Sequence, residues 1–320
     1  MLTALGRALA LTACLVVAAG AVAAKATRAE DKRPEDLKSL LLLSSNWTYQ
    51  LQDAKPRELA DTRYDVVVMD AFFGGGKREV EKLRALPVGK RRLVLAYLSI
   101  GEAEVYRFYW QVCCAGGKRP AWIGKENPRW PGNYRVQYWN DEWKSILFEG
   151  GVDSYLKQIV DLGFDGVYLD RVDVFQEYRA TAAPDGESPR TKMVRLVSEI
   201  SRAAKRLRPG MLIVAQNAEE LVEDRAYLNA IDGVAKEDLL FGIAGDGKRN
   251  PASEIAHSVA LLQRAYAAGK HIMVVEYLKD TARIEMARTE ILELGFVPYF
   301  APRSLGRLQI EDLESHDSHR

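Results

Sequence analysis

The sequence contains few of the residues that hold metal ions or cross-link chains. Among 320 residues there are only three cysteines and four histidines. The cysteines are Cys14, Cys113 and Cys114, and the histidines are His257, His271, His316 and His319. Three cysteines are too few for a disulfide framework in a chain of this size. The histidines are scattered along the chain and form no ligand set, so the sequence predicts no metal site.

An excess of charge of one sign is also absent. The chain has 45 basic and 44 acidic side chains, a formal net charge of +1. Removing residues 1–23 deletes Arg7 and no acid, which leaves the rest of the chain balanced. Since nucleic-acid binding depends on a basic surface, we expect no nucleic-acid partner.

Long apolar runs are missing except at the start. "MLTALGRALALTACLVVAAGAVAA" has one early cation, an apolar stretch and a small-x-small pattern. This pattern predicts a signal peptide over residues 1–23, cleaved near Ala23, and hence a secreted or periplasmic protein with no stable membrane insertion after cleavage. An uncleaved anchor and lipidation at Cys14 in "LTAC" are the alternatives.

What is abundant is an alternation of apolar β-rich runs with helical segments. Eight such runs cover residues 46–52, 65–72, 92–100, 165–170, 212–217, 231–238, 271–278 and 295–301. Two segments have apolar residues at helical spacing, so each is expected to form a helix with one apolar face. In segment 191–207 that face consists of Met193, Leu196, Val197, Ile200 and Leu207, and in segment 253–269 it consists of Ile255, Val259, Leu262 and Tyr266. Near-continuous apolar strands with interleaved helices predict an α/β fold, a single-domain (β/α)8 TIM barrel.

The predicted barrel covers residues 45–305. Before it lies a linker with a short helix over 24–44, and after it a polar tail over 306–320. A doubly wound open sheet is the alternative, but no run is followed by a G-x-G-x-x-G turn, and "FFGGGKRE" has neither that spacing nor a P-loop's Ser or Thr.

The segment "DGVYLDRVD" places acids at the end of the fourth run. Strand side chains alternate, so Tyr168 and Asp170 share one face. In the sixth run, Ala235 and Glu237 share a face in the same way. Because active sites of TIM barrels lie at the carboxyl ends of the strands, both carboxyls are expected to face the same mouth.

Other polar side chains follow the remaining runs. They are Asp70, Glu102, Asn217, Glu219 and Glu276. Each alone could be a helix cap or a charge on the rim. Their recurrence at one end of the predicted barrel instead indicates a polar cleft.

Aromatic residues are concentrated in one long loop, residues 106–143. Five of the six tryptophans lie there, Trp130 and Trp139 among them. Aromatic faces suit the C–H faces of sugar rings, although a small core beneath a long loop is the simpler explanation. We expect some of these rings to be buried and others to line the cleft.

Six motifs together resemble a known family. They are "YQLQ", "LAYLSIGEAE", "NPRWPGNYRVQYW", "GFDGVYLDRVD", "QNAEEL" and "IDGVAKEDLLF". Over roughly residues 45–303 the chain resembles glycoside hydrolases related to family 114, the endo-α-1,4-polygalactosaminidases. The resemblance implies a (β/α)8 barrel that hydrolyses galactosamine-containing polysaccharide outside the cytoplasm, without metal or cofactor. It also implies catalytic acids on strands four and six, which match Asp170 and Glu237.

Glycosidic cleavage requires one carboxylic acid and one carboxylate. We expect Asp170 to be the nucleophile, kept ionised by Arg171 and nearby loop amides, and Glu237 to be the acid/base, with a pKa raised at an apolar strand end. The roles could be reversed. Inversion and retention, endo and exo attack and the oligomeric state stay open. The expected substrate contacts are Tyr49, Asp70, Tyr97, Glu102, Trp139, Asn217, Glu276 and Tyr277. Asp70 and Glu102 would add charge-assisted binding of an amino sugar.

Two other functions compete with hydrolysis. A class I aldolase would need a strand-six lysine, but Lys236 has the opposite parity to Glu237 and is expected to face the helices. A polysaccharide-binding barrel without turnover is the stronger alternative. The presence of both Asp170 and Glu237 favours the enzyme.

Overall fold

The computed structural model describes residues 36–86, 91–178, 186–306 and 308. The predicted signal peptide, its cleavage near Ala23, Cys14 and nearly all of the predicted tail lie outside the described residues. The described part of the predicted linker contains helix α1 (Leu37–Leu42), which begins where Asp36 accepts a hydrogen bond from the Ser39 amide at 3.2 Å.

Eight parallel strands form one sheet. Their order is β1 (Trp47–Gln50), β2 (Val66–Asp70), β3 (Leu93–Ser99), β7 (Gly166–Asp170), β8 (Leu212–Gln216), β9 (Gly233–Glu237), β12 (His271–Glu276) and β13 (Val297–Phe300). Each of the eight predicted runs contains one of these strands. In β3 all seven residues are buried, as expected for a strand covered on both faces.

Side chains join the first strand to the last. The indole Nε1 of Trp47 donates to the Val297 carbonyl at 3.0 Å, and the Thr48 hydroxyl donates to the Tyr299 hydroxyl at 3.0 Å. The sheet therefore curls into a nearly closed (β/α)8 TIM barrel rather than a doubly wound open sheet.

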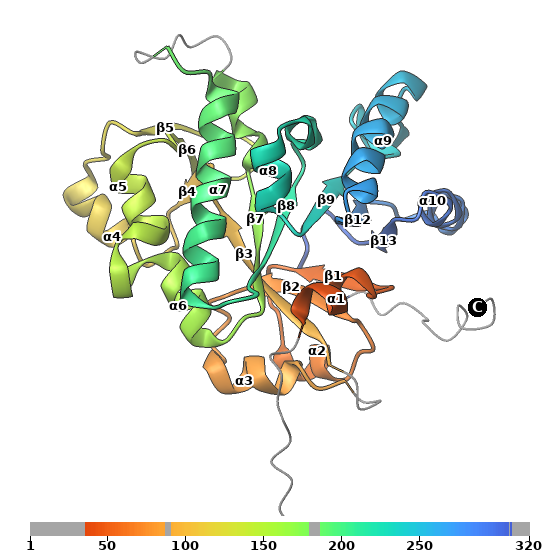
Figure 1. The fold of residues 1–320 in the computed structure, drawn as a ribbon, viewed down its shortest axis with the longest axis horizontal. Helices are drawn as coiled ribbons and strands as arrows, with labels where there is room; N and C mark the ends of the chain where they lie inside the picture. The colour runs from red at the N-terminus through yellow and green to blue at the C-terminus, as the bar shows by residue number, and fades with distance from the viewer. Residues whose placement is uncertain (1–35, 87–90, 179–185, 307, 309–320) are drawn as a thin grey trace, which may run out of the picture. The chain divides into compact units, whose positions relative to one another are not determined.

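Helices alternate with the strands along the chain (Figure 1). They are α2 (Pro56–Ala60), α3 (Gly76–Leu83), α6 (Tyr155–Leu162), α7 (Pro189–Leu207), α8 (Arg225–Ala230), α9 (Ala252–Ala267) and α10 (Thr281–Glu293), with 3-10 turns η3 (Gly151–Asp153), η4 (Val172–Tyr178) and η5 (Glu219–Glu223). Helix α7 starts at the Ser188 cap, with Pro189 in its first turn. The two predicted apolar faces are confirmed except at their last members, Leu207 and Tyr266, which are 40% and 49% exposed.

The long aromatic loop after β3 is folded. It holds an antiparallel sheet in the order β4 (Glu102–Glu104), β6 (Asn133–Val136) and β5 (Ile123–Glu126), with α4 (Trp110–Cys113), η1 (Ala115–Gly117), α5 (Asp141–Lys144) and the π-helical turn η2 (Ser145–Glu149). Trp143 is fully buried and donates to the Ile100 carbonyl at 2.9 Å. Much of the aromatic content therefore forms a satellite core, and Cys113 and Cys114 are free thiols within it.

The barrel interior is packed with aromatic rings. Trp47, Tyr49, Tyr168 and Tyr299 come from inward positions of three strands, with ring centroids 4.9 Å apart for Tyr49 and Tyr168. After β9 the chain forms a short hairpin of β10 (Phe241–Gly242) and β11 (Gly245–Arg249).

The amino ends of the strands are closed by an ionic cluster. Asp165 is fully buried and pairs with Arg84, Arg91 and Arg208 at 3.2, 2.8 and 3.1 Å. Asp165 thus belongs to the scaffold.

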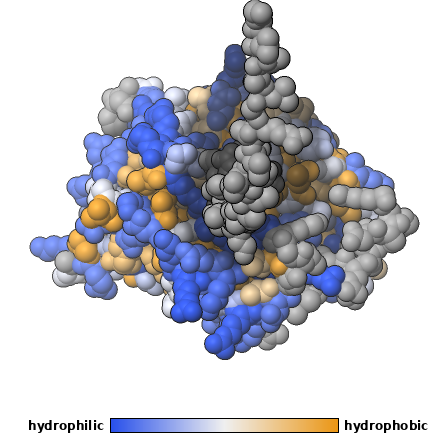
Figure 2. Space-filling model, turned by 60° about the horizontal axis from the view of Figure 1, so that its bottom comes forward, coloured by the Kyte–Doolittle hydropathy of each residue, from blue (hydrophilic) through white to orange (hydrophobic). Residues whose placement is uncertain are grey.

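No helix among the described residues is long and apolar enough to cross a membrane. On the face shown in Figure 2, apolar side chains lie in small groups between hydrophilic ones.

Candidate active site

The last residues of β7 and β9 are Asp170 and Glu237, as the alternation of strand side chains predicts. Asp170 follows Tyr168 on the inward face of β7, and Tyr168 packs against Tyr49 inside the barrel. Both carboxyls are partly exposed at the carboxyl ends of the strands. This is the end at which TIM barrels carry their chemistry.

Asp170 is held by two donors. The Tyr97 hydroxyl donates to its Oδ2 at 2.7 Å, and the Arg171 amide donates to its Oδ1 at 2.7 Å. Burial and the negative charge of Glu237 raise the pKa of Asp170 to about 7, against the lowering effect of the Tyr97 hydrogen bond. The two carboxyls therefore interact electrostatically, and Asp170 holds its proton up to near neutral pH.

Glu237 is held by neighbours on both sides. The Asn217 side chain donates to its Oε2 at 3.0 Å and accepts from its backbone amide at 3.0 Å. The Tyr277 hydroxyl donates to Oε1. Each carboxyl of the pair is thus fixed by one further donor and by a tyrosine, Tyr97 in the neighbouring β3 or Tyr277 directly after the neighbouring β12.

The backbone is left-handed where three of the strands end. Arg171, Asn217 and Asp238 have φ values of 59°, 57° and 53°. Residues other than glycine adopt this conformation at some energetic cost, and such positions gather at functional sites. Here each of them directly follows the end of β7, β8 or β9.

Arg171 does not pair with Asp170 through its side chain. Its guanidinium binds Glu102 at 2.8 Å, Asp173 at 3.2 Å and Glu177. The positive charge of Arg171 still lowers the pKa of Asp170, but burial and the charge of Glu237 outweigh it, so the expectation that Arg171 keeps Asp170 ionised is wrong. Glu102 itself is 2% exposed and also accepts from Asn127 at 2.9 Å, so its carboxylate anchors Arg171 and the loop.

Tyr49 lies in the barrel interior, close enough to Asp170 and Glu237 to be affected by their charges. Its hydroxyl donates to Gln216 at 3.3 Å. Burial, with the nearby Tyr168 and the charges of Asp170 and Glu237, raises the pKa of Tyr49 well above its usual range. It is 2% exposed and forms part of the floor beneath the pair. A direct contact of Tyr49 with a sugar stays a prediction.

The predicted role of Glu276 as a substrate contact needs correction. Its side chain is fully buried and accepts the amides of Leu240 at 2.6 Å and Phe241 at 3.3 Å. The register explains why: Val275 pairs with Glu237, so Glu276 has the opposite parity and points out of the barrel. It anchors the hairpin after β9, whereas Tyr277, one residue on, returns to the inside.

Trp139 is engaged in packing. Its ring lies edge-on to Tyr178 at 5.0 Å, and the Lys192 ammonium lies 4.7 Å from its centroid. These contacts argue against the predicted stacking of a sugar on Trp139. Trp130 is 43% exposed, and stacking of a sugar on that ring stays a prediction.

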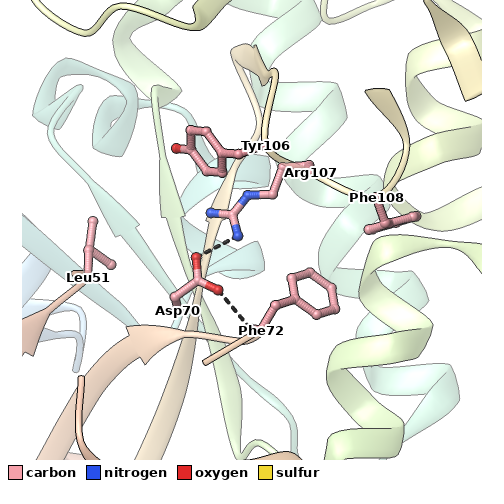
Figure 3. Close-up of a pocket in the computed structure, with 6 residues that line it drawn as sticks. All are labelled: Leu51, Asp70, Phe72, Tyr106, Arg107 and Phe108. Carbon is pink, nitrogen blue, oxygen red and sulfur yellow. Dashed lines mark hydrogen bonds and ion pairs between the residues drawn. The ribbon is translucent and has the colours of Figure 1, made fainter. Parts of the chain in front are cut away.

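A pocket of about 550 Å³ lies at the end of β2 (Figure 3). It is lined by Leu51, Asp70, Phe72, Tyr106, Arg107 and Phe108. Asp70 pairs with Arg107 at 2.5 Å and accepts the Phe72 amide at 2.7 Å. Arg107 lies 6.0 Å from the ring of Tyr97, which binds Asp170, so this pocket adjoins the catalytic candidates.

Sequence analysis missed most of this pocket. Phe72 precedes the triple glycine, and Tyr106, Arg107 and Phe108 open the aromatic loop. The motif "YRFYW" was a signal of this wall, since it sets one cation among four aromatic residues. A second hollow of about 560 Å³ lies beyond Tyr277 and includes Leu278, Lys279 and Phe300.

The class I aldolase gains no support from the described residues. Lys236 pairs with Glu219 at 3.1 Å, on the opposite side of β9 from Glu237, as its parity predicts. No group of three or more His, Cys, Asp or Glu side chains in the described part of the chain could hold a metal ion. His271 is buried and bonds to Ser44 at 3.0 Å, and burial lowers its pKa to about 4.

Relatives of the chain are found in distant prokaryotes. It is 36% identical to an uncharacterized protein of Methanocaldococcus jannaschii, covering 84% of this chain and 80% of that one. It is 34% identical to an uncharacterized protein of Thermotoga maritima, covering 81% of each. These names give no activity.

Among solved structures, the chain resembles the glycoside hydrolase domain of PelA from Pseudomonas aeruginosa, with a TM-score of 0.63, 20% identity and coverage of 83% of this chain and 97% of that one. At this identity the likeness shows the barrel fold. Residues 23–315 match the family described as glycoside-hydrolase family GH114. That match spans nearly the whole chain, including both strand-end carboxyls, and the protein therefore belongs to glycoside-hydrolase family GH114.

Proposed function

We propose that this protein is an exported glycoside hydrolase that cleaves α-linked, galactosamine-containing polysaccharide with Asp170 and Glu237 as its catalytic pair. The observation that carries the proposal is the pair itself. Two carboxyls from different strands interact electrostatically, and each is held by its own tyrosine, Tyr97 or Tyr277. Glycosidic cleavage needs two such groups, one protonated and one ionised.

The pair carries a single shared proton in its active form. Since burial and the charge of Glu237 raise the pKa of Asp170 to about 7, the second ionisation of the pair falls near neutral pH. Loss of that proton leaves no acid for the leaving group, and uptake of a second leaves no carboxylate. Activity should therefore follow a bell-shaped pH profile whose limbs belong to the pair as a whole.

We assign Asp170 as the nucleophile or base and Glu237 as the acid. The assignment rests on the family resemblance, because the raised pKa of Asp170 gives no electrostatic reason for it. The roles can be separated with aryl glycosides whose leaving groups need no protonation. Glu237→Gln should then recover much of its lost rate on such substrates, and Asp170→Asn should not. The opposite pattern would reverse the roles.

Amino-sugar specificity is supported by the acids around the mouth. Asp70 lies in the pocket beside the pair, with a side chain 18% exposed. Its charge is partly offset by Arg107, but Arg107 is shared with Glu104 at 2.6 Å, so the three groups together stay negative. A negative cleft favours a cationic polymer over an anionic one. The rings of Phe72, Tyr106 and Phe108 add apolar surface for a sugar next to the cleaved bond.

Hydrolysis of a defined polymer tests the proposal. The protein starting near Ala24 should release reducing ends from partially deacetylated α-1,4-galactosamine polymer, and it should leave neutral and uronic-acid glycans intact. Asp170→Asn and Glu237→Gln should each abolish release while polymer binding persists. Binding without release by the wild-type protein would identify a polysaccharide-binding barrel instead.

Export is the other part of the proposal. It is supported by the leader-like composition of residues 1–23. In the native cell the mature N-terminus should lie near Ala24. Purified mature protein that still begins at Met1 would contradict it.

A further inference from the structure

Arg303 lies in the segment that follows β13 at the carboxyl end of the barrel. The segment, residues 301–306, leaves β13 and reaches the end of β1, where the amides of Leu51 and Gln52 donate to the Leu305 carbonyl at 3.1 and 3.3 Å. Arg303 lies between these bonds and that of the Ala301 amide to the Glu276 carbonyl at 3.3 Å, so its side chain extends from a backbone anchored on both sides.

The guanidinium of Arg303 has three partners. It binds both carboxylate oxygens of Asp238, at 2.9 and 3.0 Å, in a bidentate pair. Its Nε donates to Asp246 of the β11 strand at 2.9 Å. Its Cζ also lies 4.2 Å from the centroid of the Tyr277 ring, within the range of a cation–π contact.

Two of these partners are the immediate neighbours of Glu237. Asp238 follows Glu237 in the chain and has a left-handed backbone, with φ 53°. Tyr277 donates its hydroxyl to the Glu237 carboxyl. One cation thus holds both the backbone that carries Glu237 and the ring that orients its side chain.

The fork geometry matters here. A bidentate guanidinium–carboxylate pair fixes orientation as well as distance, which a lysine ammonium cannot do. Here the bidentate pair holds Asp238, whose left-handed backbone conformation is energetically costly for a residue other than glycine. Without Arg303, the backbone at the end of β9 and the ring of Tyr277 would both become more mobile.

We propose that Arg303 is a positioning residue for Glu237, acting through Asp238 and Tyr277. The inference rests on the proposed function, since it takes Glu237 to be part of the catalytic pair. A reacting carboxyl displaced by about 1 Å can cost on the order of 100-fold in rate. Removing Arg303 should therefore lower kcat while KM stays near its wild-type value.

The chain offers a matched control in Arg249. This arginine also pairs with a carboxylate, Glu290, at 2.7 Å, and it lies 5.1 Å from the centroid of a ring, Phe241. Phe241 has no hydroxyl to donate to Glu237. Comparing Arg303→Gln with Arg249→Gln thus separates the positioning of Glu237 from the general effect of losing an arginine that pairs with a carboxylate and lies on an aromatic ring.

Kinetics on the galactosamine polymer form the first part of the test. Arg303→Gln should reduce kcat by about 10- to 100-fold, Arg303→Lys should reduce it less, and Arg249→Gln should stay within about twofold of wild type. Thermal midpoints show whether each variant is folded. A wild-type kcat in Arg303→Gln, or equal losses in the Arg303 and Arg249 variants, would overturn the inference.

Crystal structures of wild type and Arg303→Gln form the second part, which needs no substrate. The Tyr277–Glu237 hydrogen bond should be present in wild type and broken or displaced in the variant. An unchanged bond overturns the inference whatever the kinetics show. If the wild-type protein hydrolyses no polymer, the proposed function fails, and this comparison still decides whether Arg303 positions Glu237.

Discussion

Asn217 and Glu237 are joined by two reciprocal hydrogen bonds of 3.0 Å, one to the carboxyl and one from the backbone amide of the glutamate. The amide side chain can serve both because it is a donor and an acceptor at once. Asn217 also adopts the left-handed backbone that asparagine and aspartate tolerate better than other non-glycine residues. This residue type is therefore favoured at this point by both geometry and chemistry.

Replacing Asn217 by Asp isolates the donor. Aspartate can keep the backbone conformation and the acceptor for the Glu237 amide, but it removes the N–H group and adds a negative charge beside the carboxyl. We expect kcat on the polymer to fall by about 10- to 100-fold and the pH optimum to move upward, since added negative charge favours protonated carboxyls. A pH–rate profile equal to that of wild type would show that the donor is dispensable.

Asp170 should make the protein less stable as the pH rises. Its pKa in the native state is raised to about 7, against roughly 3.9 in an unfolded chain. The native state thus binds this proton more tightly, and the resulting stability is complete below about pH 4 and is lost as the pH rises through about 7. Asp170→Asn has no such proton to lose.

The difference in free energy of unfolding between Asp170→Asn and wild type should therefore shift in favour of the variant from pH 4 to pH 8. Urea titrations at several pH values measure it. Parallel pH dependence in the two proteins would contradict the raised pKa.

Tyr106→Ala tests the aromatic pocket beside Asp170. Tyr106 is 63% exposed and forms one wall of the pocket in Figure 3. If a sugar stacks there, the loss should be about 1 kcal/mol, which raises KM for long oligosaccharides and leaves kcat on the shortest substrate unchanged.

Trp139→Ala is the comparison, since that ring packs against Tyr178. This variant should lose stability more than affinity. Equal loss of affinity in the Trp139 and Tyr106 variants would place sugar binding on both rings.

Asp165→Asn should separate scaffold from chemistry. The carboxylate is fully buried among three arginines at the amino ends of the strands. Removing its charge leaves these cations without their common partner, and breaking a buried ion pair costs on the order of 3 to 5 kcal/mol. Denaturant unfolding should show the loss, while kcat of the folded fraction stays near wild type. An inactive but fully stable variant would move Asp165 into the chemistry.

Strand periodicity was sufficient to predict the pair. All eight strands lie within predicted apolar runs, and alternation alone placed Asp170 and Glu237 on inward positions. The expectation for Glu276 rests only on its place near the end of a run. In the register of β12 with β9, Val275 pairs with Glu237, so Glu276 faces out of the barrel. The local sequence around Glu276 contains no information about which strand residue pairs with Glu237.

Contacts made by loops could not be predicted in this way. Arg107 reaches Asp70, and Arg303 reaches Asp238, from segments 37 and 65 residues away in the chain. The periodicity of strands and helices does not relate such positions, because the path of each loop determines which residues its side chains contact. Arg171 shows the same limit: its neighbour Asp170 seemed the obvious partner, but the guanidinium extends to Glu102 instead.

The seam between β1 and β13 has a consequence for how the chain reaches its native state. Trp47 and Thr48, near the start of the described chain, find their hydrogen-bond partners only on the final strand, about 250 residues later. Contacts between such distant parts of a chain form slowly, because a long loop must be ordered first. A growing polypeptide therefore cannot complete the aromatic interior until Val297–Phe300 has been synthesised, and truncated chains that lack β13 would expose the indole and tyrosine rings of an open barrel to aggregation.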